Sequence, residues 1–296
     1  MPRSSSLTEF PVADPAAGPY AVTTGPDGAL WFTELHAGSI GRMTTAGEYV
    51  SYPLGLESPQ PTVITTGPDS ALWFTTNQAH VVGRITTDGK VHTFDLPTPG
   101  ACPYGITSGP DGALWFAELA AGAIARITTE GVVTEFAIPV ENAMPSVLTT
   151  GPDGALWFTM NQGNAIGRID TSGDVTVHPL PTPGAAPVGI TSGPDALWFV
   201  EIGAGAVGRI TPDGAITEFP LPDPAARPHA IAADPRGGYW FTEWAGNRIG
   251  HIGEDGRVAH HALPTPSSEP HGITIGPDGA VWVAQECGSL ARLSTP

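Results

Sequence analysis

Charged residues are scarce in this chain, and positively charged residues are the scarcest. Only 14% of the 296 residues are charged, and 12 lysines and arginines stand against 29 aspartates and glutamates, for a formal net charge of −17. A protein this acidic repels nucleic acid and anionic membrane surfaces. We therefore expect no nucleic acid partner, no membrane partner, and a ligand that is neutral or cationic.

Cysteine and long apolar segments are also nearly absent. The two cysteines, Cys102 and Cys287, indicate no disulfide framework, because a single pair so far apart carries no pattern. No apolar run approaches the roughly 18 residues of a membrane span, and the opening Met-Pro-Arg-Ser-Ser-Ser contains no apolar signal segment. These features predict a cytoplasmic protein with reduced, idle thiols.

Glycine and proline are abundant instead, with 38 and 32 residues. Breakers at this density, without a collagen or low-complexity period, predict many turns and many short strands. A tryptophan also recurs at intervals of 41 or 42 residues, each time inside a phrase such as Gly25-Pro-Asp-Gly-Ala-Leu-Trp-Phe-Thr33. The recurring tryptophans are Trp31, Trp73, Trp115, Trp157, Trp198, Trp240 and Trp282.

Each repeat predicts four strands, which is the content of one β-propeller blade. The first strand follows a proline, the second contains Trp-Phe, the third has the Ile-Gly-Arg pattern and the fourth the Thr-Glu-Phe pattern. Adjacent Trp and Phe point to opposite faces, so each is expected to pack against a different neighbouring blade. The sequence thus predicts an all-β fold, a single seven-bladed β-propeller over residues 1–296 with four antiparallel strands per blade. Its blades start near residues 19, 61, 103, 145, 187, 228 and 270.

The two ends of the chain complement each other. The seventh repeat stops before its fourth strand, whereas residues 7–12, Leu-Thr-Glu-Phe-Pro-Val, match the fourth strand that begins at Ile216. We expect residues 7–12 to complete blade seven and close the ring, which removes exposed sheet edges. A closed ring has no obvious need of a partner, so we expect a monomer.

Positions at which the repeats differ are candidates for function, because shared positions report the fold. The residues flanking the proline of the first strand vary most, and they ring one mouth of the predicted channel. Charged or histidine side chains occur there only in blades six and seven: Arg227, His229, Glu269 and His271. An aromatic wall is expected from Tyr20, Tyr104 and Trp244, the one tryptophan outside the repeat.

Hairpin counting brings an acidic pair together in blade seven. If the first two strands close on the Gly-Pro-Asp-Gly turn at residues 276–279, Glu269 faces Glu286 and His271 faces Ala284. Opposed carboxylates destabilise a sheet, so a divalent cation is expected between them. Two carboxylates completed by water suit Mg²⁺ better than Zn²⁺, with His271 as a base beside the metal. The alternative is a hydrogen-bonded polar plug in the channel.

Other polar residues have a simpler interpretation. We expect the glutamates that end the second strands to be ion-pair partners of the third-strand arginines or solvated strand ends. They are Glu34, Glu118, Glu201 and Glu243. The histidines on hairpins and outer strands, His36 among them, are expected at the surface.

At the mouth residues the chain resembles the streptogramin B lyases, the virginiamycin B lyase family. The resemblance covers essentially the whole chain, and its specific marks are Arg227-Pro-His229-Ala-Ile, Glu269-Pro-His271-Gly-Ile and Glu286-Cys287. It implies a Mg²⁺-dependent lyase that inactivates cyclic depsipeptide antibiotics by eliminative cleavage of their ester bond.

The resemblance also implies a role for each residue by position. His271 is the implied general base, Glu269 and Glu286 are the implied metal ligands, and His229 is implied to bind substrate, beside the aromatic wall. Two other functions remain open from the sequence: a non-catalytic propeller that binds a peptide or polysaccharide, and a lactone hydrolase on the same fold.

Overall fold

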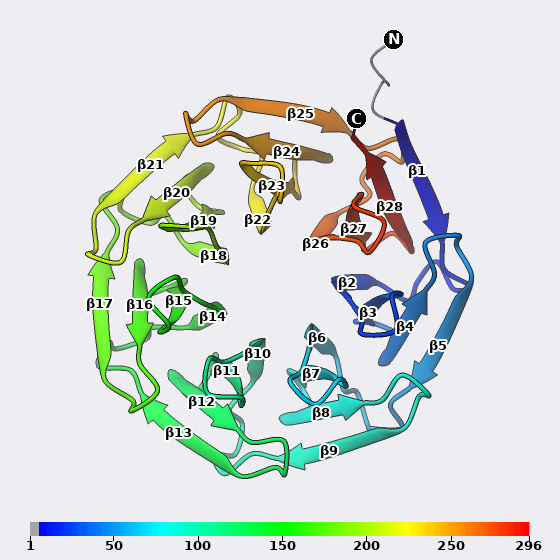
Figure 1. Cartoon of the computed structure of the whole chain (residues 1–296), viewed down its shortest axis with the longest axis horizontal. Helices are drawn as coiled ribbons and strands as arrows, with labels where there is room; N and C mark the ends of the chain where they lie inside the picture. The colour runs from blue at the N-terminus through cyan, green and yellow to red at the C-terminus, as the bar shows by residue number, and fades with distance from the viewer. Residues whose placement is uncertain (1–5, 296) are drawn as a thin grey trace.

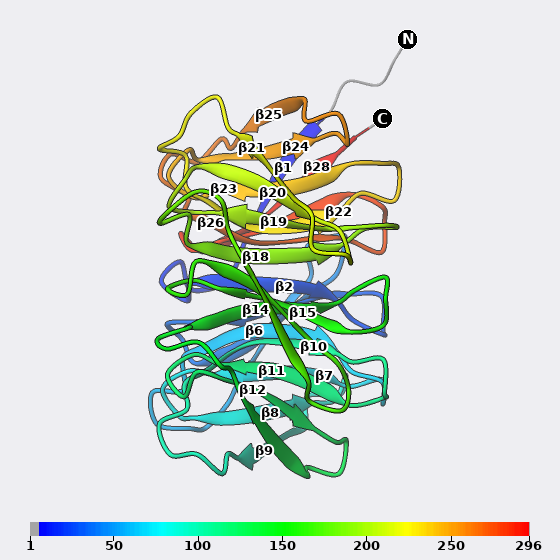
Figure 2. The same ribbon diagram turned by 90° about the vertical axis from the view of Figure 1, so that its left-hand side faces the viewer.

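A computed structural model describes residues 6–295, and residues 1–5 and 296 lie outside the described part. Seven sheets, each of four antiparallel strands, stand around a central channel, so the predicted seven-bladed propeller is confirmed (Figure 1). Figure 2 shows the ring from the side, with the blades stacked edge-on. Residues 6–295 contain no helix long and apolar enough to cross a membrane.

The strands occupy equivalent places in every blade. The innermost strands are β2 (Pro19–Thr24), β6 (Pro61–Thr66), β10 (Pro103–Ser108), β14 (Pro145–Thr150), β18 (Pro187–Ser192), β22 (Pro228–Ala233) and β26 (Pro270–Ile275). The second strands are β3 (Leu30–Glu34), β7 (Leu72–Thr76), β11 (Leu114–Glu118), β15 (Leu156–Met160), β19 (Leu197–Glu201), β23 (Tyr239–Glu243) and β27 (Val281–Gln285).

The third strands are β4 (Ser39–Met43), β8 (Val81–Ile85), β12 (Ala123–Ile127), β16 (Ala165–Ile169), β20 (Ala206–Ile210), β24 (Arg248–Ile252) and β28 (Ser289–Ser294). The outer strands are β5 (Tyr49–Pro53), β9 (Val91–Asp95), β13 (Val133–Ala137), β17 (Val175–Pro179), β21 (Ile216–Pro220), β25 (Val258–Ala262) and β1 (Ser6–Pro11).

The first strand of the chain closes the ring, as predicted. Strand β1 pairs antiparallel with β28, from Ser6 opposite Ser294 to Pro11 opposite Ser289, and the order of this sheet is β1-β28-β27-β26. Blade seven is therefore built from the first and the last described strands, and β1 and β28 lie side by side in Figure 1.

The core lies between blades rather than within them. Trp31 of blade one packs with Phe74 of blade two, and Phe32, on the other face of β3, packs with Trp282 of blade seven. The expectation that the neighbouring Trp and Phe face different blades is therefore confirmed. Six of the seven repeat tryptophans are no more than 1% exposed, which makes them the largest buried groups in the molecule.

The recurring third-strand arginines, which lie opposite the repeat tryptophans, do not pair with the strand-end glutamates, so that interpretation was wrong. Arg42 lies opposite Trp31 in the β3–β4 register, and its Nε donates to Asp27 of the turn at 2.7 Å. The Trp31 indole donates to the other oxygen of Asp27 at 2.9 Å. Blades two, three, four and seven repeat this Asp–Trp–Arg clasp.

The strand-end glutamates are not solvated either. Glu34, Glu118, Glu201 and Glu243 are all 0% exposed. Glu34 accepts hydrogen bonds from Tyr49 and Ser51 of its own blade, at 2.5 Å each. Glu243 pairs with Arg248, which stands at the start of β24 rather than at the recurring arginine position.

Candidate active site

A left-handed backbone position precedes the innermost strand of every blade. The residue before the innermost strand has a positive φ, between 45° and 68°, in all seven blades. This conformation disfavours side chains other than glycine by about 1–2 kcal/mol. Gly18 is the only glycine of the set, and the others are Gln60, Cys102, Met144, Ala186, Arg227 and Glu269. The fold thus accepts local backbone strain at the six positions that carry a side chain.

In blade seven this position brings the acidic pair together. A hydrogen bond of 3.1 Å from the Glu286 amide to the Glu269 carbonyl places the two residues opposite each other, as hairpin counting predicted. The expected pairing of His271 with Ala284 does not form, because a β-bulge between Pro270 and Ile273 shifts the register.

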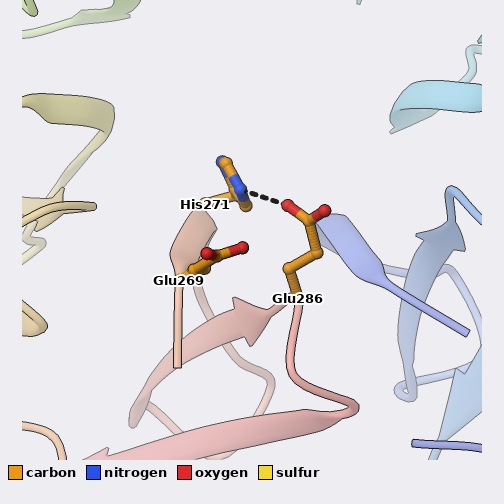
Figure 3. A group of neighbouring side chains, drawn as sticks. All are labelled: Glu269, His271 and Glu286. Atoms are coloured by element: carbon orange, nitrogen blue, oxygen red, sulfur yellow. Dashed lines mark hydrogen bonds and ion pairs between the residues drawn. The ribbon is translucent and has the colours of Figure 1, made fainter. Parts of the chain in front are cut away.

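Three side chains of blade seven converge at the mouth end of this hairpin. The ligand atoms of Glu269, His271 and Glu286 all lie within 4.8 Å of one another (Figure 3). His271 Nε2 and Glu286 Oε2 are 2.6 Å apart. His271 is buried, whereas Glu269 is exposed at the mouth. The hydrogen bond from His271 lowers the pKa of Glu286 to about 2, so this carboxylate is ionised at neutral pH.

The predicted aromatic wall surrounds His271. The Tyr20 ring lies over the imidazole with centroids 4.5 Å apart, His229 meets it edge-on at 4.6 Å, and Trp244 is 6.4 Å away. The Tyr20 hydroxyl lies 2.5 Å from the Tyr104 hydroxyl and 3.3 Å from His229 Nε2. The structure therefore brings Tyr20, His229 and Trp244 around one imidazole, and Tyr104 joins them through Tyr20. Arg227, the remaining charged residue predicted at the mouth, lies over the Trp244 ring at 5.6 Å from its centroid.

Burial keeps these neighbours uncharged. Burial, with a smaller effect of His271, lowers the pKa of His229 to about 3, so this histidine is neutral at pH 7. Burial also raises the pKa of Tyr20 and of Tyr104 above the ordinary tyrosine value. The three side chains line the central channel, a cavity of about 140 Å³ whose remaining walls are mainly aliphatic. The charged side chains of the mouth therefore lie next to an uncharged channel lining.

Three buried polar atoms at the mouth have no partner. Among residues 6–295, no group hydrogen-bonds to Nδ1 of His229, Nδ1 of His271 or Nε1 of Trp244. Leaving such an atom unpaired costs about 1–3 kcal/mol, so orphans of this kind call for an explanation. Their concentration around His271 indicates a site for a polar ligand and argues against the self-satisfied polar plug.

The donor set fits a hard divalent cation. Glu269 and Glu286 offer carboxylate oxygens, which Mg²⁺ prefers, and two ligands of one octahedral Mg²⁺ ion stand about 3–4.2 Å apart. The ligand atoms of the three side chains lie within 4.8 Å of one another, which is close to this range. Exposure of Glu269 leaves room for the water ligands that Mg²⁺ retains.

His36 is a residue that the sequence interpretation missed. Its Nε2 lies 2.8 Å from Oε1 of Glu286, so the expected surface histidine joins the cluster. His36 follows β3 in blade one, and repeat comparison within blades does not reveal a contact that crosses from one blade to the next. The available signal was Gly18, the single glycine at the left-handed position, whose missing side chain leaves room for the imidazole.

Solved lyase structures share this architecture. A streptogramin B lyase gives a TM-score of 0.95 at 41% identity, over 99% of this chain and 98% of that one. Virginiamycin B lyase from Staphylococcus aureus, with selenomethionine, gives 0.95 at 43% identity, over 99% of this chain and 100% of that one. A catalytically inactive histidine-to-alanine variant of the S. aureus protein with quinupristin gives 0.95 at 41% identity, over 99% and 100% of the two chains. The propeller and its mouth thus define the structural class of the streptogramin B lyases.

The family follows from the sequence match. Residues 5–293 match the virginiamycin B lyase family, and the chain belongs to it. Among curated proteins, virginiamycin B lyase of Saccharopolyspora erythraea is 56% identical over 56 residues, which is 19% of each chain. That of Streptomyces coelicolor is 56% identical over 39 residues, or 13% of each chain. These two matched segments span less than a fifth of the curated relatives.

Proposed function

We propose that this protein linearises type B streptogramin antibiotics, which are cyclic depsipeptides, by eliminative cleavage of their ester bond. The observation that carries the proposal is the convergence of Glu269, His271 and Glu286 within 4.8 Å at a mouth with unpaired polar atoms. Family membership and the solved relatives support the choice of substrate class. Inactivation of the antibiotic would be the result.

The chemistry requires a base and a site for the leaving carboxylate. We assign to His271 the removal of the proton from Cα of the threonine-derived residue. The electron pair of that bond forms the Cα–Cβ double bond, the Cβ–O ester bond breaks, and its electrons leave with the carboxylate. The Glu286 carboxylate orients the imidazole by accepting from Nε2 at 2.6 Å, and it stabilises the imidazolium that forms.

The metal and the wall have separate roles in this proposal. Glu269 and Glu286 would hold Mg²⁺, which supplies an electrophile for the ester carbonyl or the departing carboxylate. Neutral His229 and the Trp244 indole would offer their unpaired nitrogen atoms to the polar groups of the substrate. Tyr20, which packs against His271 with the rings tilted by 36° and is hydrogen-bonded to Tyr104, would fix the orientation of the imidazole.

One assay tests the reaction type. The protein is incubated with a type B streptogramin, with and without EDTA, and the product is analysed by mass spectrometry. We expect a linear product of unchanged mass, formed only when the metal is available. A product heavier by one water identifies a lactone hydrolase, and an antibiotic that is bound but stays cyclic identifies a binding propeller.

The first prediction about the site concerns the substitution His271→Ala. Loss of a positioned general base lowers the rate by roughly 10²–10⁴-fold, and we expect ring opening to fall to that extent. Thermal unfolding of the variant is measured as the control for folding. A folded His271→Ala protein that opens the antibiotic at the full rate removes His271 from the mechanism.

A further inference from the structure

We propose that His36 is a positioning residue that fixes the carboxylate of Glu286 from the neighbouring blade, and that Gly18 provides the space for it. The inference rests on the proposed function, because it assigns His36 a part in that same site. Among residues 6–295, the hydrogen bond of the His36 side chain within the cluster goes to Glu286, and His36 acts through that residue.

Two imidazoles hold the two oxygens of Glu286 separately. Oε2 lies 2.6 Å from Nε2 of His271, and Oε1 lies 2.8 Å from Nε2 of His36. The terminal torsion of a glutamate is broad, so a single hydrogen bond leaves the carboxylate free to rotate. A second hydrogen bond from another direction fixes the carboxylate plane. His36 therefore determines which oxygen faces His271 and which faces outward.

The space for His36 comes from a departure from the repeat. In the other six blades the left-handed position before the innermost strand carries a side chain, whereas blade one has Gly18. A Cβ atom on Gly18 would lie 2.4 Å from Cδ2 of His36, closer than real Cβ contacts come. The imidazole thus occupies the volume that a side chain fills in every other blade.

The main chain also holds His36 in place. Its amide donates to the carbonyl of Ala17 at 3.0 Å, and the Leu35 amide donates to the carbonyl of Gly18 at 2.8 Å. The β3–β4 loop is therefore tied to the segment that precedes β2. Although the His36 side chain is 50% exposed, its backbone is anchored beside the site.

Hydrogen bonds to a metal-binding carboxylate have measurable effects. Residues that orient such ligands from outside typically change metal affinity or activity 10–100-fold when they are replaced. We expect His36→Leu, which keeps bulk but removes the donor, to lower kcat about 10-fold or more. The KM for the antibiotic should change less than about twofold, because His36 does not touch the substrate in this proposal.

Two further variants separate positioning from packing. His36→Gln keeps an N–H donor at a similar reach and should restore most of kcat. Gly18→Ala should displace the imidazole and reproduce the His36→Leu effect. Ala186 has the same left-handed conformation in blade five, so the blade tolerates alanine there. The double variant should be no worse than either single one, because both remove the same contact.

A metal measurement provides a readout that is independent of activity. Mn²⁺ is added to each protein without substrate, and the free ion is measured by electron paramagnetic resonance. We expect His36→Leu and Gly18→Ala to weaken Mn²⁺ binding about 10-fold, and His36→Gln to bind nearly as the parent does. His92→Gln, an exposed change on β9, is the matched control and should equal the parent in every assay. Circular dichroism checks that each variant is folded.

The outcomes separate this inference from the proposed function. If the parent opens the antibiotic and His36→Leu matches it in kcat and in Mn²⁺ affinity, the inference is overturned and the function stands. If the parent opens no antibiotic, the proposed function fails, and the Mn²⁺ affinities alone decide the role of His36. If His36→Leu does not fold, His36→Gln and Gly18→Ala decide it by the same two measurements.

Discussion

At the scale of single residues, two buried glutamates stand out because they face other carboxyl groups. Both oxygens of Glu118 and of Glu201 lack a hydrogen-bond donor among residues 6–295. Burial and the nearby Glu135 raise the pKa of Glu118 to about 8, and burial with Glu218 does the same for Glu201. Glu118 and Glu201 are therefore protonated at neutral pH, and each can donate a hydrogen bond to the carboxyl group beside it.

Blade seven contains the same arrangement with a permanent donor. Gln285 stands where Glu118 stands in blade three, and its amide donates to Glu9 at 3.1 Å. Glu9 in turn accepts from the Thr265 hydroxyl at 2.7 Å, just as Glu135 accepts from Thr98. Where the outer strand carries a glutamate, as in blades three, five and seven, the facing residue at the end of the second strand is one that can donate a hydrogen bond.

A pH dependence of stability follows from the raised pKa values. The folded-state pKa lies above the unfolded value near 4.5, so the stabilisation is complete below pH 4.5 and is lost as pH rises through 8. We expect the free energy of unfolding to fall between pH 5 and pH 9. Glu118→Gln and Glu201→Gln should flatten this slope, and exposed Glu57→Gln should not. Urea unfolding at several pH values measures it, and parallel slopes in all variants contradict the assignment.

Some residues of the site could be predicted from the sequence and others could not, for a physical reason. Glu269 and Glu286 belong to one hairpin, so counting from its turn places them opposite each other. His36 reaches Glu286 from another blade, and local periodicity carries no information on such a contact. The protonation of Glu118 was also hidden, because it depends on burial and on a carboxyl group 17 residues away in the sequence.

At the scale of the structural element, the Asp–Trp–Arg clasp makes the Gly-Pro-Asp-Gly turn more than a chain reversal. Blade five provides a natural comparison, because its turn lacks one residue and reads Gly-Pro-Asp-Ala. Asp195 there is 78% exposed in its side chain and lies 3.5 Å from Arg209. Within the described residues, no hydrogen bond joins Asp195 to Trp198.

Because blade three has the clasp and blade five lacks it, replacing the turn aspartate should lower the unfolding free energy by different amounts in the two blades. Asp111→Ala leaves the Trp115 indole and Arg126 without their partner, and we expect a loss of about 1–3 kcal/mol in unfolding free energy. Asp195→Ala should cost less than about 0.5 kcal/mol, as for an exposed pair. Denaturant midpoints of the two variants measure the difference, and equal losses show that the clasp adds no stability.

Strand faces were predictable, whereas the partners of long side chains were not. Alternation placed Trp31 and Phe32 against different blades, since the period of a strand is two residues. The partner of Arg42 depends on the β3–β4 register, which sets it opposite Trp31 and three positions away from Glu34. A flexible arginine follows its nearest acceptor, which here is the turn aspartate.

At the scale of the whole molecule, closure of the ring depends on one strand, β1, that is not linked to the rest of its blade by a chain connection. Phe10 of β1 stacks on Trp282 with ring centroids 5.3 Å apart, and Phe94 of β9 stacks on Trp73 at the same distance. The two pairs are equivalent except that β1 is joined to its blade only through hydrogen bonds and packing. The number of blades was predictable from the seven recurring tryptophans, and closure was predictable because the seventh repeat lacks a fourth strand that residues 7–12 match.

Matched substitutions test the closure. We expect Phe10→Ala and Phe94→Ala each to cost roughly 2–4 kcal/mol, because a partly buried ring is lost. Only Phe10→Ala should also release β1 and expose the edge of β28, which allows pairing between molecules. Size-exclusion chromatography should then show oligomers for Phe10→Ala and monomers for Phe94→Ala. Identical elution of the two proteins contradicts a special role for β1.

Construction of blade seven from both termini has a consequence for biosynthesis. Glu269, His271 and Glu286 lie in a segment that is translated after the first six blades, and their sheet is completed by β1, which is translated before those blades. A nascent chain that has finished six blades has therefore not yet assembled this side-chain cluster. The cluster can form only once β26 and β27 have been translated, and its sheet is complete only when β1 pairs with β28.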